Sequence, residues 1–463
     1  MLSHLVSDAS DSVPITPVAS DDFKATLAAL DEAGRRWLQA TAFTAEPGKI
    51  ALLPDAKGGL VRVLVGYRRD EERWALAGLP EALPQGRYRL DPVPAPAAAT
   101  RMALGWALGC YAFTRYKERK RGFADLVWPA GADRGAVERL ARGIGLARDL
   151  INTPAEHMGP SDLAGAVVDL AARHKGECRV IAGDALLAEN YPMIHAVGRA
   201  SARPPALADL CWGDPAAPKL TLVGKGVCFD SGGLDLKTAS GMRLMKKDMG
   251  GAATLIGLAS AVMEARLPVR LRLLVPAVEN AVAGNAFRPL DVIRTRMGVT
   301  VEIGNTDAEG RLILCDALAE ADRERPALLL DMATLTGAAR TALGPELPAL
   351  FSPDEGLAAD LLAASAAEQD PLWRLPLWQP YRKMLKSSVA DLNNVSESGF
   401  AGAIVAAVYL QEFVAKETAW AHIDTYAWNQ TGRPGRPEGG EALALRALYA
   451  AIERRFGQQG SGR

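Results

Sequence analysis

Several features that often reveal a function are missing from this chain of 463 residues. Lysine and arginine number 53 and aspartate and glutamate 54, so the formal net charge of −1 provides no general attraction to nucleic acid or anionic lipid. No apolar run reaches the length of a transmembrane helix, and the first residues lack the apolar core of a signal peptide. The sequence therefore predicts a cytoplasmic protein without a membrane partner.

Cysteine and histidine are scarce, and neither forms a recognisable metal motif. The five cysteines are scattered without a C-x-x-C pair, which predicts buried, reduced thiols, although a catalytic role for Cys228 stays open. The five histidines are isolated from one another, and His422 is expected to be buried and hydrogen-bonded. The phosphate-loop pattern G-x-x-x-x-G-K-[ST] is also absent, which argues against nucleotide binding.

Charged residues are instead concentrated in one short segment that contains Asp307, Glu309 and Arg311. The preceding run at residues 299–303 has the character of a strand, and a helical apolar pattern begins at Arg311. The two carboxylates and the guanidinium are therefore expected where a strand leads into a helix. In α/β sheets such junctions line ligand crevices.

A second concentration of charge lies upstream, in a glycine-rich segment that follows a short apolar strand at residues 220–223. Glycine allows tight turns and a close approach of the backbone to a ligand. With the first segment, this region supplies four carboxylates: Asp230, Asp248, Asp307 and Glu309. Such hard oxygen donors suit Mg, Mn or Zn.

The charge of these carboxylates indicates how many metal ions they hold. A single divalent ion would leave half of four negative charges uncompensated in a desolvated cleft, whereas two divalent ions would balance them. Lys225 fits the same site as a neutral amine, because nearby cations lower the pKa of an ammonium and only the deprotonated nitrogen can bind a metal.

Simpler interpretations exist for each residue taken alone. Asp307 and Glu309 could cap the helix that begins near Arg311, and Asp248 could cap a helix beginning near residue 250. Lysines are usually solvated at the surface. The joint occurrence of these residues favours the metal site.

Three blocks of this sequence closely resemble the leucyl (cytosol) aminopeptidases, the M17 family of two-metal exopeptidases. They are VGKGVCFDSGGLDLK (223–237), MKKDMGGAA (245–253) and NTDAEGRLIL (305–314), within a resemblance that extends from about Asn152 to about Phe456. The resemblance implies five metal ligands, Lys225, Asp230, Asp248, Asp307 and Glu309. It implies two catalytic residues, Lys237 and Arg311, and four substrate-binding residues, Met245, Thr334, Leu335 and Gly337.

The same resemblance implies an aminopeptidase that attacks peptides with a free N-terminus through a hydroxide bridging two divalent ions, either Zn or Mn. Lys237 would stabilise the developing oxyanion. Arg311 cannot act as a base at neutral pH, and in the family it holds a bicarbonate ion that moves protons. Members of the family form homohexamers whose active sites face an interior cavity.

The chain departs from its leucine-preferring relatives after residue 424, where Tyr426 and Asn429 replace small and apolar residues. If both line the pocket for the N-terminal side chain, they should narrow it, add polar groups and weaken the selectivity for leucine. Alternatively, Tyr426 and Trp428 point into the core or a subunit interface.

The predicted fold class is α/β, with a smaller α/β N-terminal domain at residues 1–132 and a catalytic domain at 133–463. Strands are expected at residues 50–53, 60–65 and 74–77, and a helix at 102–113. Alternating strands and helices in the second domain predict a central mixed sheet covered by helices on both faces. The residues at 458–462 are expected to be disordered.

Two other classes of function remain to be compared with the enzyme. One is a catalytically silent scaffold or nucleic-acid-binding member of the same fold. The basic run at residues 117–121 could serve as a nucleic-acid patch, but a solvated helix end before an interdomain linker at residues 129–132 explains that run better. The other is a two-metal phosphatase or amidohydrolase, which usually employs histidine ligands. The seven implied metal and catalytic positions are all intact, which favours the peptidase.

Overall fold

Two units make up the chain in the computed structural model, which describes residues 1–457. The first unit contains residues 1–145 and 431–438, and the second contains residues 146–430 and those from 439 onward. The tail that the sequence predicts to be disordered, at residues 458–462, lies outside the described residues.

The first unit is built on a six-stranded sheet with the order β1-β6-β5-β2-β4-β3, in which only the β3–β4 pair is antiparallel. Its strands are β1 (Leu5–Val6), β2 (Val13–Ala19), β3 (Ile50–Pro54), β4 (Leu60–Tyr67), β5 (Arg87–Leu90) and β6 (Asp125–Val127). Its helices are η1 (Leu2–His4), η2 (Ser20–Asp22), α1 (Phe23–Ala29), α2 (Glu32–Ala40), η3 (Arg69–Trp74), α3 (Leu79–Ala82) and α4 (Pro96–Gly109). Helix α5 (Arg134–Asn152) crosses the boundary between the units.

The strand predicted at residues 74–77 is wrong. Trp74 ends the short helix η3, and residues 75–78 form turns before α3. Residues 75–77 are all buried, because this segment packs against α4. A short apolar run of this kind carries no periodicity that separates a strand from a buried turn.

The second unit is built on a nine-stranded mixed sheet with the order β16-β15-β18-β14-β9-β11-β8-β7, to which β10 adds by pairing with β11. The strands are β7 (Glu177–Ala182), β8 (Ala206–Trp212), β9 (Lys219–Gly224), β10 (Gly226–Asp230), β11 (Arg270–Asn280), β14 (Leu328–Ala333), β15 (Ala349–Phe351), β16 (Trp373–Arg374) and β18 (Trp420–Asp424). The central strands β18, β14, β9, β11 and β10 run parallel, and the β15–β18, β11–β8 and β8–β7 pairs are antiparallel.

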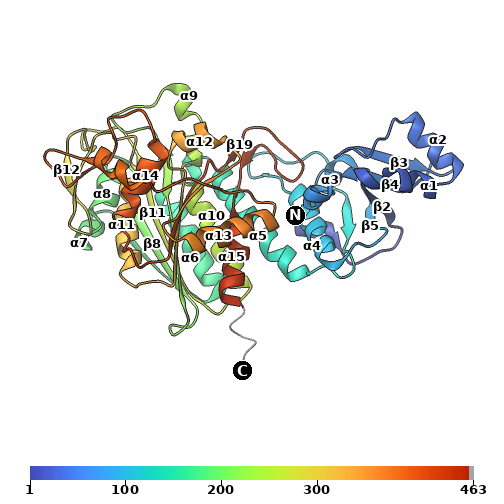
Figure 1. The fold of residues 1–463 in the computed structure, drawn as a ribbon, viewed down its shortest axis with the longest axis horizontal. Helices are drawn as coiled ribbons and strands as arrows, with labels where there is room; N and C mark the ends of the chain where they lie inside the picture. Colours follow the sequence, from blue (N-terminus) through green and yellow to red (C-terminus); the bar gives the residue numbers. More distant parts are fainter. Residues whose placement is uncertain (458–463) are drawn as a thin grey trace. The chain divides into compact units, whose positions relative to one another are not determined.

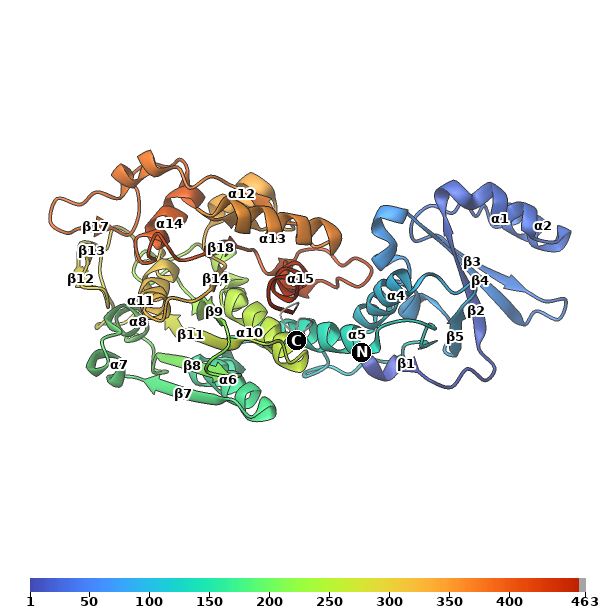
Figure 2. The ribbon, with the colours of Figure 1, turned by 60° about the horizontal axis from the view of Figure 1, so that its bottom comes forward.

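Helices cover both faces of this sheet, as the sequence predicts. Figures 1 and 2 show α8, α11 and α14 on one face and α6, α10, α13 and α15 on the other. The helices are η4 (Ala155–His157), α6 (Pro160–His174), α7 (Ala185–Ala188), α8 (Pro192–Gly198), α9 (Ala239–Met242), η5 (Met245–Lys247), α10 (Gly250–Glu264), α11 (Gly310–Asp322), α12 (Gly337–Leu343), α13 (Glu355–Ala367), η6 (Gln379–Leu385), α14 (Gly402–Gln411) and α15 (Leu445–Phe456). Strands β14 and β18 are buried along their full length, because both of their faces are covered. The α/β fold class is confirmed.

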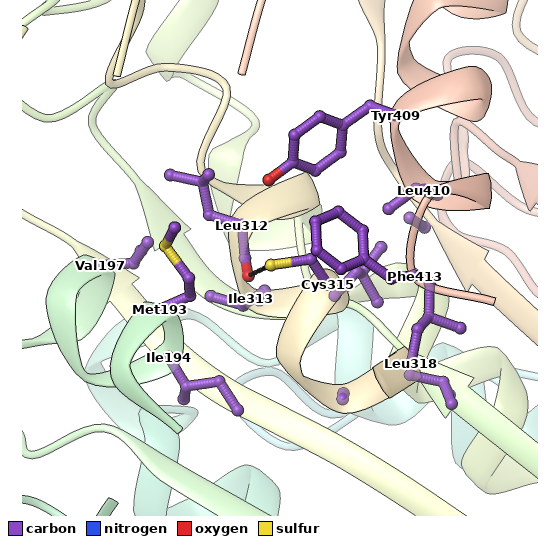
Figure 3. Packing of buried hydrophobic residues seen from close by; sticks show 14 of the residues in the cluster. Met193, Ile194, Val197, Leu312, Ile313, Cys315, Leu318, Tyr409, Leu410 and Phe413 are labelled. Atoms are coloured by element: carbon purple, nitrogen blue, oxygen red, sulfur yellow. Dashed lines mark hydrogen bonds between the residues drawn. The ribbon is translucent and has the colours of Figure 1, made fainter. Parts of the chain in front are cut away.

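A large apolar cluster joins α8, α11 and α14 to the sheet. Figure 3 shows Met193, Cys315 and Phe413 among its side chains, with the Cys315 thiol donating to the Leu312 carbonyl at 3.0 Å. Burial raises the pKa of the Cys315 thiol, which accords with the predicted inert, buried cysteine.

Among residues 1–457, no helix combines the length and apolar character that crossing a membrane requires.

Two small sheets complete the unit. One is the three-stranded sheet of β12 (Val292–Arg294), β13 (Thr300–Glu302) and β17 (Leu392–Asn393), and the other pairs β19 (Trp428–Asn429) with β20 (Gly439–Gly440). The predicted strand before Asp307 is therefore present as β13, but it lies outside the central sheet.

Candidate active site

The carboxyl ends of the central strands bring together most of the residues singled out from the sequence. Strands β9, β14 and β18 are parallel neighbours, so their carboxyl ends lie at one edge of the sheet. Lys225 follows β9, Asp230 ends β10 and Thr334 follows β14. Ligands of α/β proteins bind at this edge, because it is where the loops between strands and helices meet.

Two glycines allow the charged loops to approach closely. Gly232 has a φ of +89°, and a Cβ there would lie 2.9 Å from an oxygen of Asp307. A Cβ on Gly310, at the first turn of α11, would lie 2.5 Å from Cε of Lys225. Both positions therefore require glycine, the first for its backbone conformation and the second for lack of space.

The predicted ligands converge at this edge. Nζ of Lys225 lies 2.6 Å from Asp248 and 2.9 Å from Glu309. Nζ of Lys237 lies 2.7 Å from Asp230 and 2.5 Å from Asp307. The five predicted metal ligands and Lys237 thus form one cluster of alternating charge, called here the carboxylate–lysine cluster.

The capping interpretation of these carboxylates is wrong. Glu309 precedes α11 and Met249 precedes α10, but neither side chain makes a capping hydrogen bond. Asp248 instead accepts a hydrogen bond from the hydroxyl of Thr334 at 2.7 Å. The carboxylates therefore face one another rather than the ends of their helices.

The pKa values in the cluster show that burial and neighbouring negative charges oppose the ionisation of its carboxyl groups. Burial, followed by the charge of Asp230, raises the pKa of Glu309 to about 8. Burial and the charge of Asp248 raise the pKa of Asp230 to about 6. Burial disfavours the ammonium of Lys225, but Asp248, Glu309 and Asp230 outweigh that effect and raise its pKa.

The sequence predicts the opposite shift for Lys225, a fall in its pKa beside two metal ions. The difference has a physical reason, since the four carboxylates stabilise whichever positive charge lies among them. Divalent ions at these positions would replace the ammonium charge and allow the Lys225 nitrogen to lose its proton.

Buried carboxylate oxygens that lack hydrogen bonds show that these residues fit a metal centre. Both carboxylate oxygens of Glu309 are buried without a hydrogen bond, and only one of them contacts Lys225. Ligand atoms of Asp230, Asp307 and Glu309 lie within 4.8 Å of one another. A buried carboxylate oxygen without a donor costs free energy, and a cation would recover it.

Asn280 is a residue of the site that the sequence analysis did not single out. Its amide donates to Asp230 at 2.9 Å and to the carbonyl of Thr306 at 3.0 Å. It therefore connects the segment that carries Asp230 to the segment that carries Asp307 and Glu309. It is the last residue of β11. Its position as a polar residue ending a buried strand was the signal that could have identified it.

Arg311 lies apart from the cluster's ion pairs. The residue is 8% exposed. Its guanidinium donates to the carbonyl of Asn394 at 2.6 Å and forms no ion pair with a carboxylate of the described residues. Burial lowers its pKa. Arg311 therefore offers a buried positive charge on which Glu309 and Asp424 act without forming an ion pair.

A cavity of about 560 Å³ opens beside the cluster. Lys225, Asp230, Lys237, Asp248 and Asp307 line one part of it, and the wall also contains the four predicted substrate-binding residues Met245, Thr334, Leu335 and Gly337. This volume lies within the range of about 300–1,000 Å³ that is usual for sites binding small ligands. The cavity can therefore hold part of a substrate next to the predicted metal ligands.

The residues that depart from the leucine-preferring pattern have separate positions. Tyr426 is half-buried and lines the cavity. Asn429 is buried elsewhere, with its amide donating to Glu441 at 2.8 Å, and Trp428 has its ring 5.4 Å from Nζ of Lys246. Of the two substitutions singled out from the sequence, Tyr426 lines this cavity and Asn429 does not.

The remaining candidates have structural positions. His422 is fully buried with Nδ1 2.5 Å from Asp331, which confirms the expected buried, hydrogen-bonded histidine. Cys228 is also fully buried, and burial raises the pKa of its thiol far above the ordinary value. A catalytic thiolate at Cys228 is therefore excluded.

The chain matches two models of known families over most of its length. The model described as "Cytosol aminopeptidase family, catalytic domain" matches residues 145–449. The model described as "M17 aminopeptidase, N-terminal domain" matches residues 13–129.

Individual relatives agree with these matches. The crystal structure of the cytosol aminopeptidase from Coxiella burnetii is 50% identical, with a TM-score of 0.94 over 98% of this chain and 99% of that chain. The bottromycin maturation enzyme BotP in complex with Mn is 35% identical, with a TM-score of 0.87 over 96% of this chain and 100% of that chain. A probable cytosol aminopeptidase from Geobacter sp. (strain M21) is 42% identical over 376 residues, 78% of this chain and 76% of that protein.

Proposed function

The chain belongs to the cytosol aminopeptidase family, and we propose that it releases N-terminal residues from peptides with two divalent metal ions bound at the carboxylate–lysine cluster. The observation that carries the proposal is the convergence of five ligand side chains beside a cavity large enough for an amino-acid side chain. A catalytically silent scaffold would not need buried carboxylate oxygens that lack donors.

The metal ions would be held by Lys225, Asp230, Asp248, Asp307 and Glu309. These oxygen and amine donors suit both Mn and Zn, and the Mn in the structure of BotP supports the first. Bound there, divalent ions supply Lewis-acid chemistry that activates water and polarises the scissile carbonyl.

Lys237 would stabilise negative charge that develops on the carbonyl oxygen of the substrate. Burial disfavours its ammonium, but Asp230 and Asp307 outweigh that effect and raise its pKa, so the side chain stays positively charged at neutral pH. The two carboxylates also fix the position of Nζ. A preorganised cation of this kind acts in the transition state without reorganisation.

Arg311 would bind bicarbonate, which then transfers protons. The guanidinium is planar and presents parallel donors that suit bidentate binding of such an anion. Its burial without an ion pair among the described residues favours an anionic ligand. Arg311 itself has no basic lone pair for general-base catalysis.

The cavity wall of Met245, Thr334, Leu335 and Gly337 would hold the N-terminal side chain of the peptide. The free α-amine would then lie at the carboxylate–lysine cluster, which makes the enzyme an exopeptidase. By family resemblance we also propose a cytoplasmic homohexamer.

The decisive experiment measures the hydrolysis of two kinds of substrate, aminoacyl p-nitroanilides and p-nitrophenyl phosphate. Each is tested with protein loaded with Mn or Zn and with protein treated with a chelator. Metal-dependent release from the aminoacyl substrates alone is the expected result. Release from the phosphoryl substrates would instead identify a two-metal phosphatase, and no release from either would favour the silent scaffold.

A further inference from the structure

The helix η5 is very short, yet residues of the site lie within it and directly after it. It is a single turn from Met245 to Lys247, with Met245 in the cavity wall and the predicted metal ligand Asp248 next in the chain. No side chain caps its beginning. A single helical turn has little stability of its own in water, because nucleation of a helix is unfavourable. Contacts with the rest of the fold therefore have to hold Asp248 in place.

Lys246, the middle residue of η5, is a half-buried cation that the catalytic proposal does not use. Its ammonium donates to the carbonyl of Asn152 at 2.6 Å, and Nζ lies 5.4 Å from the centroid of the Trp428 ring. Within residues 1–457 it forms no ion pair with a carboxylate. Asn152 is the last residue of α5, so the ammonium lies at the negative end of that helix dipole.

Asn152 belongs to a buried polar network of the second unit. Its side-chain oxygen accepts the backbone N–H of Gly440 at 2.8 Å. One turn earlier in α5, Arg148 donates to both carboxylate oxygens of Glu441, at 3.1 and 2.9 Å. Bidentate pairs of this kind fix the geometry of both partners. The end of α5 is therefore fixed to residues 439–441.

Trp428, the second partner of Lys246, is tied to the same network. It forms β19 together with Asn429, whose amide donates to Glu441 at 2.8 Å. Strand β19 also pairs with β20. The end of α5, strand β19 and residues 439–441 are called here the anchoring frame, and both contacts of the Lys246 ammonium are made with it.

The residue before β19 contacts the chain on the other side of Asp248. Ala427 is fully buried with a φ of +53°, and its carbonyl accepts the backbone N–H of Glu441 at 3.1 Å. A Cβ on Gly250, the first residue of α10, would lie 2.3 Å from Cβ of Ala427, so the two residues pack closely. A left-handed alanine persists only where its surroundings hold it. Asp248 therefore lies between two contacts with this region, one made two residues before it and one two residues after it.

We propose that Lys246 is a positioning residue for metal binding, which ties η5 to the anchoring frame and thereby holds Asp248 in the carboxylate–lysine cluster. Lys246 does not line the cavity, so its effect passes through the backbone of η5. This inference rests on the proposed function, because that proposal assigns Asp248 to the metal. Loss of Lys246 should weaken the metal site although every ligand side chain is still present.

The test compares the Mn affinity of variants that keep or remove the contacts of Lys246. Lys246→Met has a similar length but no charge and no donor, whereas Lys246→Arg keeps the charge, the N–H groups and the attraction to an aromatic ring. Lys219→Met is the matched control, because the ammonium of Lys219 also donates to a backbone carbonyl, that of Glu324 at 2.9 Å, at the opposite end of β9 from the cluster. Calorimetric titration of Mn into each chelator-treated protein gives the affinity, and circular dichroism with thermal melting shows that each protein is folded.

Lys246→Met should weaken Mn binding about 10- to 100-fold, the range expected when a group that orients a metal ligand is removed. Lys246→Arg should stay within about threefold of the parent, because it can make both contacts. Lys219→Met should stay within about twofold, because it lies far from the cluster. Unchanged Mn affinity in Lys246→Met, or an equal loss in Lys219→Met, would overturn the proposal.

A second variant tests the contact with the aromatic ring. Trp428→Leu removes the ring but leaves the Lys246 hydrogen bond to Asn152, so it should weaken Mn binding about two- to fivefold. If Lys246→Met does not fold, Trp428→Leu decides the question, and an unchanged Mn affinity in that variant would contradict the role of Lys246.

The Mn titration involves no substrate, which separates this inference from the proposed function. Absence of hydrolysis by the Mn-loaded parent would overturn the proposed function, while the titration would still decide the role of Lys246. At saturating Mn, kcat of Lys246→Met for a leucyl p-nitroanilide should return to within about threefold of the parent's, because a positioning residue does not touch the reacting atoms. A kcat that stays more than about tenfold lower with Mn bound would show that Lys246 acts in the reaction itself, contrary to the proposal.

Discussion

The side-chain amide of Asn280 donates to Asp230 at 2.9 Å, although the two residues are 50 positions apart in the chain. The same oxygen of Asp230 accepts the backbone N–H of Gly232 at 2.9 Å. These two donors orient the carboxylate so that its other oxygen faces Lys237. Groups that orient metal ligands in this way affect the metal almost as strongly as the ligands themselves.

Asn280→Ala should therefore weaken Mn binding by about 10- to 100-fold and lower kcat/KM by a similar factor. Metal titration followed by activity measurements at saturating Mn checks this. The control is Asn285→Ala, because the amide of Asn285 donates to the exposed carbonyl of Arg199. Equal metal affinity in Asn280→Ala and the parent would mean that Asp230 is oriented without Asn280.

Asp307→Asn and Glu309→Gln should each abolish peptidase activity and lower the metal content, because each removes an anion that balances the metal charge. The fold should be retained, since both residues lie at the cavity edge of the sheet rather than in the apolar cluster. Metal stoichiometry measured alongside circular dichroism checks the prediction. Normal metal loading with normal activity in either variant would contradict the two-metal assignment.

Lys237→Ala should lower turnover by about 10²- to 10³-fold, the usual effect of removing one donor that stabilises an oxyanion. Metal content should change much less than turnover, because the proposed role of Lys237 lies in the transition state. Single-turnover kinetics at saturating metal separates the two effects. A loss of activity that is fully restored by added metal would instead assign Lys237 to metal binding.

Arg311→Ala should lose turnover while keeping its metal, and Arg311→Lys should recover only part of the activity, because an ammonium lacks the planar pair of donors. Added bicarbonate should change the rate of the parent but not that of Arg311→Ala. If bicarbonate affects both proteins equally, the anion does not act through Arg311.

Metal-free protein should lose stability as the pH rises from about 5 to about 8. Burial raises the pKa of Asp230 to about 6 and of Glu309 to about 8, so the folded state retains protons that the unfolded chain has already released. Stability is then highest below about pH 4, the ordinary range of these carboxyls in the unfolded chain, and falls by up to about 1.4 kcal/mol per pH unit for each retained proton as the pH rises to the folded-state values.

Urea unfolding with a chelator present, from pH 5 to pH 9, measures this slope. Glu309→Gln should flatten it between about pH 6 and pH 8, because glutamine cannot titrate. Added Mn should restore stability from pH 8 to pH 9, where Asp230 is ionised and Glu309 loses its remaining proton. An identical slope in the parent and Glu309→Gln would show that Glu309 does not hold the proton.

The local order of residues determines much of the secondary structure and sheet arrangement of this protein. The segment from β9 to Asp230, the strand β13 before Asp307 and the helix that begins at Gly310 all follow from short patterns of apolar, glycine and charged residues. The mixed sheet covered by helices also follows from the alternation of strands and helices. These features depend on neighbours within a few residues, which is why periodicity and motif spacing predict them.

Tertiary structure alone decided which distant residues meet. Asn280 joins the cluster because β10 pairs with β11, and Lys247 and Tyr426 share a wall because η5 and the end of β18 lie at the same edge of the sheet. Strand order and register set these contacts, and no local pattern encodes them. The same limit explains why the strand predicted at residues 74–77 is wrong. Packing against α4 buries a turn whose apolar residues resemble those of a strand.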